Sequence, residues 1–384
     1  MKKLTITIGV FLFLCLHLNA QDPSFSQFYA NKIYLNPALA GTDNGLNIIS
    51  SYRNQWVAAG GFTTYSVSAD LQEPCLKSAF SVSAFYDTEG DAALETFGFS
   101  GVYAYTLPLN VGNNSTKGGF GKGNVHIGFK GGYVQQRINW DNLVFSDQID
   151  PIHGIVQPTE AEIGLQQVGF ADMNVGIAWR QNWKLKHRGG MRNTKYPIRT
   201  MLGFTASHIF RPIQSFNNLS TRYPRKYTIH FGAKFPVAAS KSTTHGWKRK
   251  FYIIPNFKID WQGDNNPEFN LAQSKVITYG LYIQTPSPLY FGMMIQHQEF
   301  GFDFNNTESL ITTLGWDIGE KKEVAYTMGV SYDVNIGGLS TTSGGVLELS
   351  LRIRFQGTQL FCNGNDKRAQ RKNRDIILDC ENFF

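Results

Sequence analysis

Residues 346–355 read VLELSLRIRF, and from Leu347 onward they alternate strictly between apolar and polar side chains. Successive side chains of an extended chain point to opposite sides. One face of this stretch is therefore apolar throughout, and the other carries Glu348, Ser350, Arg352 and Arg354. The pattern predicts a β-strand whose two faces meet very different surroundings.

The same alternation recurs from about residue 45 to residue 355, for example in TTYSVSADL (63–71), NVHIGFKGGY (124–133) and KYTIHFGAKF (226–235). Fourteen such runs can be counted, near 45–57, 61–72, 77–87, 95–107, 123–138, 170–183, 197–208, 225–236, 249–260, 269–284, 288–297, 307–317, 322–334 and 345–355. No stretch predicts a helix longer than two turns. The sequence therefore predicts an all-β protein.

Two architectures produce such strands, a soluble β-sandwich and a transmembrane barrel with its apolar face turned to lipid. Most of the runs exceed the five or six residues typical of soluble strands. Aromatic residues gather at run ends, as Trp179 and Trp183 do, which suits a membrane interface. The even count suits a bacterial barrel. We therefore predict an outer-membrane β-barrel of about fourteen antiparallel strands over residues 45–355.

The first twenty residues, MKKLTITIGVFLFLCLHLNA, have the order of a secretory signal. Lys2 and Lys3 precede an apolar run, and a small residue, Ala20, ends it. We expect cleavage after Ala20, so that the mature chain is exported. The formal net charge of the whole sequence is +7, a modest excess for 384 residues.

Residues 21–44 form a lead-in that is too irregular for an amphipathic helix and too interrupted for a strand. Its core, PSFSQFYANKIYLNPALAG (23–41), is rich in aromatic residues, whereas disordered tails are usually poor in them. We predict that this lead-in plugs the lumen or the periplasmic mouth, although a disordered N-terminus is the alternative. The candidate plug residues are Phe25, Phe28, Tyr29, Tyr34, Leu35, Asn36 and Pro37.

With the N-terminus in the periplasm, the parity of the strands places the long connections 139–169 and 209–224 outside the cell. Long connections without regular structure are usually functional or disordered. We predict that they bind a partner protein; an equally open alternative is that they fold down as a lid. The candidate partner-binding residues are Trp140, Leu143, Phe145, Asp147, Asp150 and Pro151.

The cysteines that remain after signal cleavage are too few for a disulfide framework. They are Cys75, Cys362 and Cys380. A bridge between Cys362 and Cys380 is the expected pairing in an oxidising compartment, with Cys75 left over. Residues 356–384 are expected to form a periplasmic tail. The tail's basic run 367–374 lacks interleaved aromatic residues, so we do not expect nucleic acid as a partner.

Enzymatic interpretations find little support in the sequence. His153 lies near Asp147 and Asp150 in the long outer connection, but such groups are usually hydrogen-bonded loops. Ser207 and His208 are expected on opposite faces of one strand, where they could not form a catalytic dyad. We assign no catalytic residue and no metal ligand, and we expect no cofactor.

Several stretches together resemble a known family. Besides residues 23–41, they include YRNQW (52–56), VYAYTLPL (102–109), GGYVQQRINWDNLVFSDQIDP (131–151), FADMNVGIAW (170–179) and VSYDVNIGGL (330–339). In number, order and spacing they resemble the PorP/SprF family of type IX secretion-associated outer-membrane proteins, over nearly the whole mature chain to Phe355.

The resemblance implies a non-enzymatic barrel in the bacterial outer membrane, with both termini facing the periplasm. Such a barrel helps to secrete or anchor an adhesin-type surface protein used in gliding motility, or it links the translocon to its periplasmic ring. The implied partners are that cargo, type IX secretion components including periplasmic ring proteins, and outer-membrane lipid. The alternatives are a general porin or solute channel and, less favoured, an outer-membrane hydrolase.

Overall fold

The computed structural model describes residues 22–43, 45–56, 61–90, 94–109, 120–150, 152–160, 164–183, 198–216, 222–239, 250–263, 274–300, 307–319, 323–336 and 344–361. The barrel strands are β1 (Leu46–Gln55), β2 (Phe62–Glu73), β3 (Ser78–Glu89), β4 (Leu94–Leu109), β5 (Phe120–Ile138), β8 (Gln167–Trp183), β9 (Ile198–Ser207), β10 (Lys226–Ala239), β11 (Lys250–Gln262), β12 (Ser274–Gln284), β13 (Leu289–Phe300), β14 (Thr307–Ile318), β15 (Val324–Asn335) and β16 (Val346–Phe355).

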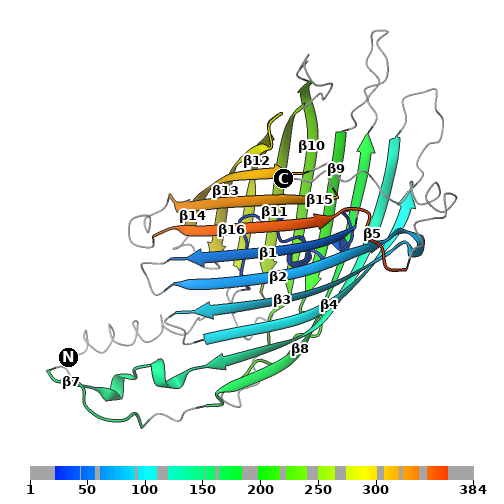
Figure 1. Cartoon of the computed structure of the whole chain (residues 1–384). Helices are drawn as coiled ribbons and strands as arrows, with labels where there is room; N and C mark the ends of the chain where they lie inside the picture. Colours follow the sequence, from blue (N-terminus) through cyan, green and yellow to red (C-terminus); the bar gives the residue numbers. More distant parts are fainter. Residues whose placement is uncertain are drawn as a thin grey trace, which may run out of the picture.

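These strands form one closed antiparallel barrel in which each strand pairs with its neighbour along the chain (Figure 1). The first and last strands close the ring, with Ile48 opposite Ile353 and Tyr52 opposite Leu349. Closure matters because lipid offers no hydrogen-bonding partner to the backbone groups of an open sheet edge. The predicted fold of about fourteen antiparallel strands is confirmed.

The two faces of the strands are sorted as the alternation predicts. In β16, Leu349 is 41 % exposed on the outside of the barrel, whereas Glu348 on the inside is fully buried. In β2, Tyr65 and Val67 face outward and Ser66 faces the lumen. The outward apolar band suits contact with lipid. None of the helices in the described ranges is long and apolar enough to cross a membrane.

Two ends of the barrel are distinguished by their connections. We call the end with the connections β5–β8 and β9–β10 the outer end, because long loops of such barrels face outward. The inner end holds the start of β1, the end of β16 and the β2–β3 turn with its 3-10 helix η3 (Pro74–Leu76). The connection of residues 139–166, the outer loop, contains η4 (Trp140–Asn142), η5 (Ser146–Gln148), β6 (Ile149–Asp150) and β7 (Gly154–Ile155).

The core of the molecule lies inside the barrel, around residues 22–43, which we call the lumen segment. This segment contains a short helix α2 (Lys32–Leu35) and a 3-10 turn η1 (Pro37–Leu39), visible within the barrel in Figure 1. Apolar residues of the segment pack against one wall of the lumen. This buried cluster comprises Phe28, Tyr29, Leu35, Ala38, Leu39, Ala178, Met201, Ile254, Tyr282, Tyr290, Met294 and Ile311.

Candidate functional site

The lumen segment runs through the barrel from its outer end to its inner end. Asp22 contacts His208, which follows the outer end of β9, and Lys226, which begins β10. Asp43 contacts Arg352, close to the inner end of β16. The expectation that both termini face the periplasm therefore does not hold at Asp22, the first described residue, which lies at the outer end.

A buried charged network holds the segment to β1, β15 and β16. The carboxylate of Glu348 accepts hydrogen bonds from the backbone N–H groups of Ser26 and Gln27, at 2.7 and 3.0 Å. Arg53 Nη1 lies 3.1 Å from Glu348 Oε2 and 3.5 Å from Asp333 Oδ2. The hydroxyl of Ser26 donates to Asp333. Because buried charges are tolerated only when paired, this network specifies where the segment enters the lumen.

The side chain of Asn36 holds the middle of the segment. Its oxygen accepts a hydrogen bond from Ala38 N at 2.9 Å and so caps η1. Its amide nitrogen lies 3.2 Å from the carbonyl oxygen of Ile177 and 3.0 Å from His230 Nε2. An amide nitrogen only donates, so His230 Nε2 accepts and Nδ1–H faces the hydroxyl of Tyr29 at 3.2 Å. The segment thus contacts β8 and β10 through one fully buried residue.

Glycines in the wall make room for η1. A Cβ atom built at Gly128 in β5 would lie 2.3 Å from the backbone nitrogen of Ala38. One at Gly176 in β8 would lie 2.0 Å from the side-chain oxygen of Asn36. The backbone of the segment therefore packs directly against the backbone of the strands, which only glycine allows.

Charged side chains close the inner end. Lys32 Nζ lies 2.7 Å from Asp43 Oδ2 and 3.0 Å from Asp70 Oδ2, and all three residues are buried. Arg180 donates to the carbonyl oxygen of Thr42 at 2.9 Å. These contacts hold the chain where it leaves the lumen and enters β1.

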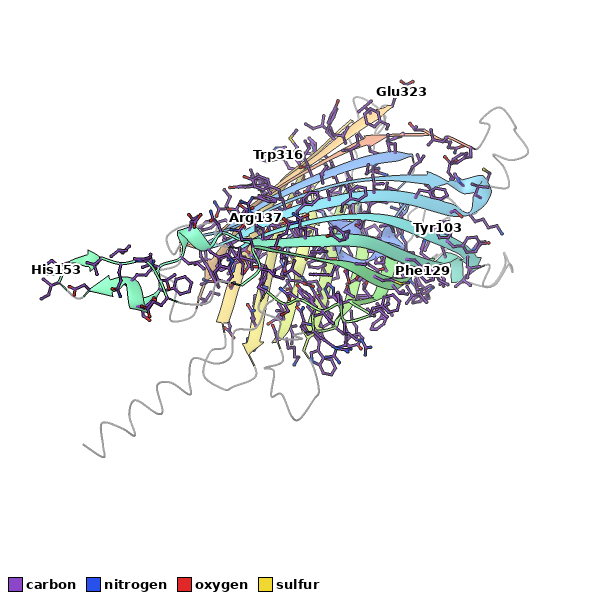
Figure 2. All side chains as sticks on the ribbon, turned by 90° about the horizontal axis from the view of Figure 1, so that it is seen from below. Tyr103, Phe129, Arg137, His153, Trp316 and Glu323 are labelled. Carbon is purple, nitrogen blue, oxygen red and sulfur yellow. The ribbon has the colours of Figure 1, made fainter. Side chains whose placement is uncertain are left out.

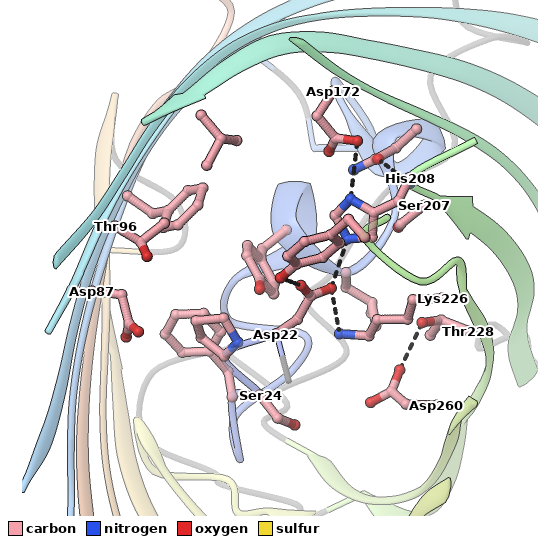
Figure 3. A pocket seen from close by; sticks show the side chains of 18 of the residues that line it. Asp22, Ser24, Asp87, Thr96, Asp172, Ser207, His208, Lys226, Thr228 and Asp260 are labelled. Carbon is pink, nitrogen blue, oxygen red and sulfur yellow. Dashed lines mark hydrogen bonds and ion pairs between the residues drawn. The ribbon is translucent and has the colours of Figure 1, made fainter. Parts of the chain in front are cut away.

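At the outer end, Asp22 is bound by residues of the β9–β10 connection. Its Oδ2 lies 2.9 Å from His208 Nε2, and its Oδ1 accepts a hydrogen bond from Tyr223 at 2.5 Å (Figure 3). His208 Nδ1 lies 3.0 Å from Asp172 Oδ1. Burial alone lowers the pKa of His208, but the two carboxylates outweigh it and raise that pKa to about 9. His208 is therefore a buried imidazolium at neutral pH.

The pKa of Asp22 moves the opposite way. Its burial raises the pKa, but the positive charges of His208 and Lys226 and the hydrogen bonds from His208 and Tyr223 hold it well below the usual range. Asp22 and His208 therefore form a charged pair throughout the neutral range.

A cavity of about 90 Å³ lies beside this pair, above the outer part of the lumen segment. Figure 3 shows Asp87 and Thr96 across the cavity from His208 and Lys226. Ser207 and His208 both line it, against expectation, because β9 ends at Ser207 and His208 takes a left-handed turn with φ 57°. Both ring nitrogens of His208 face carboxylates, so the imidazole does not act as a base toward Ser207.

The structure places every predicted plug residue inside the barrel. Tyr34 is half-buried against the cavity, and the others are buried: Phe25, Phe28, Tyr29, Leu35, Asn36 and Pro37. The polar residues that hold the segment, above all Arg53 and Glu348, were not predicted from the sequence. The sequence feature that could have identified them is a charged residue on the polar face of an alternating strand, which points into the lumen.

The predicted partner-binding residues of the outer loop fall into two groups by their contacts. Trp140, Leu143 and Phe145 are half-buried, and Trp140 Nε1 donates to the carbonyl oxygen of Leu165 at 3.3 Å. Asp147 and Asp150 bind their own loop, as described below, and Pro151 lies outside the described residues. Figure 2 shows His153 far beyond the strand end marked by Arg137, so the loop projects away from the barrel and does not cover its mouth.

His153 belongs to this projecting loop. Its Nδ1 lies 3.1 Å from Asp150 Oδ1, and its side chain is 73 % exposed. Within the described ranges, no cluster of three or more His, Cys, Asp or Glu side chains could hold a metal ion.

Cys75 in the β2–β3 turn is disulfide-bonded, so the expectation that it is left over is wrong. The sequence contains only Cys15, Cys362 and Cys380 besides it, and all of these lie outside the described residues. The expected bridge between Cys362 and Cys380 therefore involves only residues outside the described ranges, and it stays a prediction.

One protein family matches most of the chain. Residues 17–353 match the family described as type IX secretion system membrane protein PorP/SprF. The chain belongs to the PorP/SprF family. It is thus an outer-membrane β-barrel of a family associated with type IX secretion, and the resemblance seen in the sequence is confirmed. Among curated proteins, no sequence matches this chain.

Comparison with solved structures finds outer-membrane proteins at low sequence identity. The transport unit of the autotransporter AIDA-I from Escherichia coli is 12 % identical, with 85 % of this chain and 97 % of that chain covered and a TM-score of 0.29. Omp33 from Acinetobacter baumannii is 11 % identical over 82 % of this chain and all of that one, with a TM-score of 0.32. A Pseudomonas aeruginosa FadL homologue is 10 % identical over 81 % and 89 %, with a TM-score of 0.31.

Proposed function

We propose that this PorP/SprF-family protein is a non-enzymatic barrel, closed by its own lumen segment, that receives and anchors an exported adhesin-type protein at its outer end. The observation that carries the proposal is the integration of residues 22–43 into the lumen. A barrel of this size would otherwise enclose a wide passage. A segment that fills the lumen obstructs the passage that a general porin needs.

The contacts along the segment support closure. They occur at the outer end through Asp22, in the middle through Asn36 and at the inner end through Lys32. Each buried polar group of this kind would cost about 1–3 kcal/mol if its partner were removed. We therefore expect the segment to stay in place in the resting protein.

The projecting outer loop supports docking rather than a lid. Linkage of the translocon to the periplasmic ring would use the inner end. Two connections at that end have basic sequences, KLKHRGGMRNTK (184–195) and KSTTHGWKRK (241–250), and they fall almost wholly outside the described residues. The projection of the outer loop is the observation that supports the anchoring role at the outer end.

Planar-bilayer recordings test closure. Deleting residues 22–40 should raise the conductance of the purified barrel several-fold, whereas the full chain should conduct little. Equal conductance would contradict closure, provided that both proteins insert as folded barrels, as judged by heat-modifiable mobility in gels.

Surface retention tests anchoring. Cells that lack the protein should release an adhesin-type protein into the medium, and the full chain should restore its display. Unchanged display together with altered solute uptake would instead favour a porin.

A further inference from the structure

The tip of the outer loop exposes a cluster of aliphatic side chains, which we call the aliphatic tip. It consists of Ile149, Ile152, Ile155 and Val156, with exposed fractions of 52, 86, 65 and 56 %. All four lie in or beside the hairpin β6–β7, whose strands pair Ile149 with Ile155. Clustered exposed aliphatic groups outside the lipid-facing band mark an interaction surface more often than a solvated one.

The tip is held rigidly by carboxylates of its own loop. Asp147 accepts hydrogen bonds from Thr159 Oγ1 at 2.8 Å and from Glu160 N at 2.6 Å. Asp150 accepts from the backbone N–H groups of Ile152 and His153, both at 2.8 Å. A surface that is already ordered loses little conformational entropy when a partner binds. The predicted partner-binding residues Asp147 and Asp150 therefore position the tip and are not its contact surface.

The charge around the tip has one sign. Residues 139–166 contain no Lys or Arg, but they contain Asp141, Asp147, Asp150 and Glu160 among the described residues. The backbone hydrogen bond from Glu160, followed by the side-chain hydrogen bond from Thr159, lowers the pKa of Asp147, and backbone hydrogen bonds from His153 and Ile152 lower that of Asp150. The tip is thus an apolar patch with an anionic rim, which a negatively charged lipid surface would repel.

We propose that the aliphatic tip is the docking surface for a folded partner protein that presents an apolar groove edged by Lys and Arg. This inference rests on the proposed function and names the surface by which the cargo would be received. Burial of the tip would supply the affinity, and the anionic rim would orient the partner and make association depend on salt.

The test uses the full-length protein in nanodiscs and the proteins secreted by the same cells as the binding probe. Ile152→Asn with Ile155→Asn removes the tip, and Glu160→Gln removes a rim charge that does not hold the loop, because Asp147 is bonded by the backbone N–H of Glu160 and not by its carboxylate. Ile336→Asn is the matched control, because Ile336 is a 58 % exposed isoleucine at the outer end of β15. The tip variant should lose at least about tenfold in affinity, the control should match wild type, and the rim variant should bind more weakly and with less dependence on salt.

Three results would overturn the proposal while leaving anchoring by the barrel intact. They are wild-type affinity in the tip variant, an equal loss in the Ile336→Asn control, and a rim variant that binds more tightly. A photo-crosslinking residue at position 152 that captures only lipid in cells would assign the tip to a membrane and also overturn it. A wild-type protein that binds no secreted protein, in cells that still display their adhesin without it, would instead refute the proposed function itself.

Discussion

The carboxylate of Asp22 lies 2.9 Å from Nε2 of His208, and this contact joins the outer end of the lumen segment to the β9–β10 connection. His208 takes a left-handed backbone conformation there, which is unfavourable for a residue with a side chain. This charged contact joins the lumen segment to the barrel wall at the outer mouth. The strands of the wall are held to one another by backbone hydrogen bonds, which do not depend on the charge of His208. Titration of His208 should therefore act on the segment without opening the barrel.

Raising the pH should release the outer end of the lumen segment. Because the pKa of His208 is about 9 in the folded protein, above the usual 6.5, its contribution is complete below about pH 6.5 and is lost as the pH rises through 9. Asp22, Asp172, Tyr223 and Lys226 face the imidazole or its partner. Tyr223 titrates later, since burial raises its pKa well above 10.

Protease cleavage near residue 22 should accordingly become faster between pH 8 and pH 10. His208→Gln should cleave rapidly at pH 8 and show little further change. If wild type and variant respond to pH in the same way, His208 does not hold the segment.

Adding one methyl group at Gly128 should displace η1. The new Cβ atom would lie 2.3 Å from backbone atoms of Pro37 and Ala38, which cannot move aside as a flexible side chain can. Gly131 lies on the same strand, and a Cβ there would meet nothing within 4 Å. We expect Gly128→Ala to lose about 1–3 kcal/mol of unfolding free energy and to raise bilayer conductance. Gly131→Ala should do neither, and matching effects in the two variants would rule out the close packing of η1.

Removing the guanidinium of Arg53 should destabilise the barrel. Asp333 and Glu348 would then remain as buried carboxylates without their cation, at a cost of about 3–5 kcal/mol. Urea titration of Arg53→Met should show this loss. Combining Arg53→Met with Asp333→Asn should recover part of it, because one uncompensated charge is removed. Additive losses in the double variant would contradict the network.

The disulfide of Cys75 should join the turn to the chain that follows β16. The backbone N–H of Leu360 donates to the carboxylate of Glu73, and the ring of Phe361 packs against Phe80. Cys362 is the next residue in the sequence, so we expect it to be the partner. Peptide mapping without reductant should find this pair. Cys380→Ser should preserve it and Cys362→Ser should abolish it; the reverse outcome would assign Cys380.

Much of the fold could be predicted because it depends on local patterns. A strand such as β16 shows its two environments in every pair of successive residues, and the even number of strands implied closure. The aromatic density of the lead-in indicated that it packs against something. The left-handed turn at His208 was missed, because a period of two describes a strand only while the strand continues.

The contacts of the lumen segment could not be read in this way. Ser26 and Glu348 are separated by 322 positions and meet only because β16 closes the ring beside β1. Glu348 in isolation is simply a polar residue of an alternating strand, as are Arg53 and Asp333. Likewise, Asp147 and Asp150 were predicted as partner-binding residues, and only the structure shows that their carboxylates accept hydrogen bonds from their own loop.

The sequence by itself determined the exposed and lumen faces of the strands, the number of strands and the family. The tertiary structure alone decided which charges pair inside the lumen, that the segment begins at the outer end, and that the tip of the outer loop is aliphatic. The physical reason is that side-chain alternation is set by neighbouring residues along the chain. Pairing of buried charges instead depends on distances across a closed barrel, which no local pattern encodes.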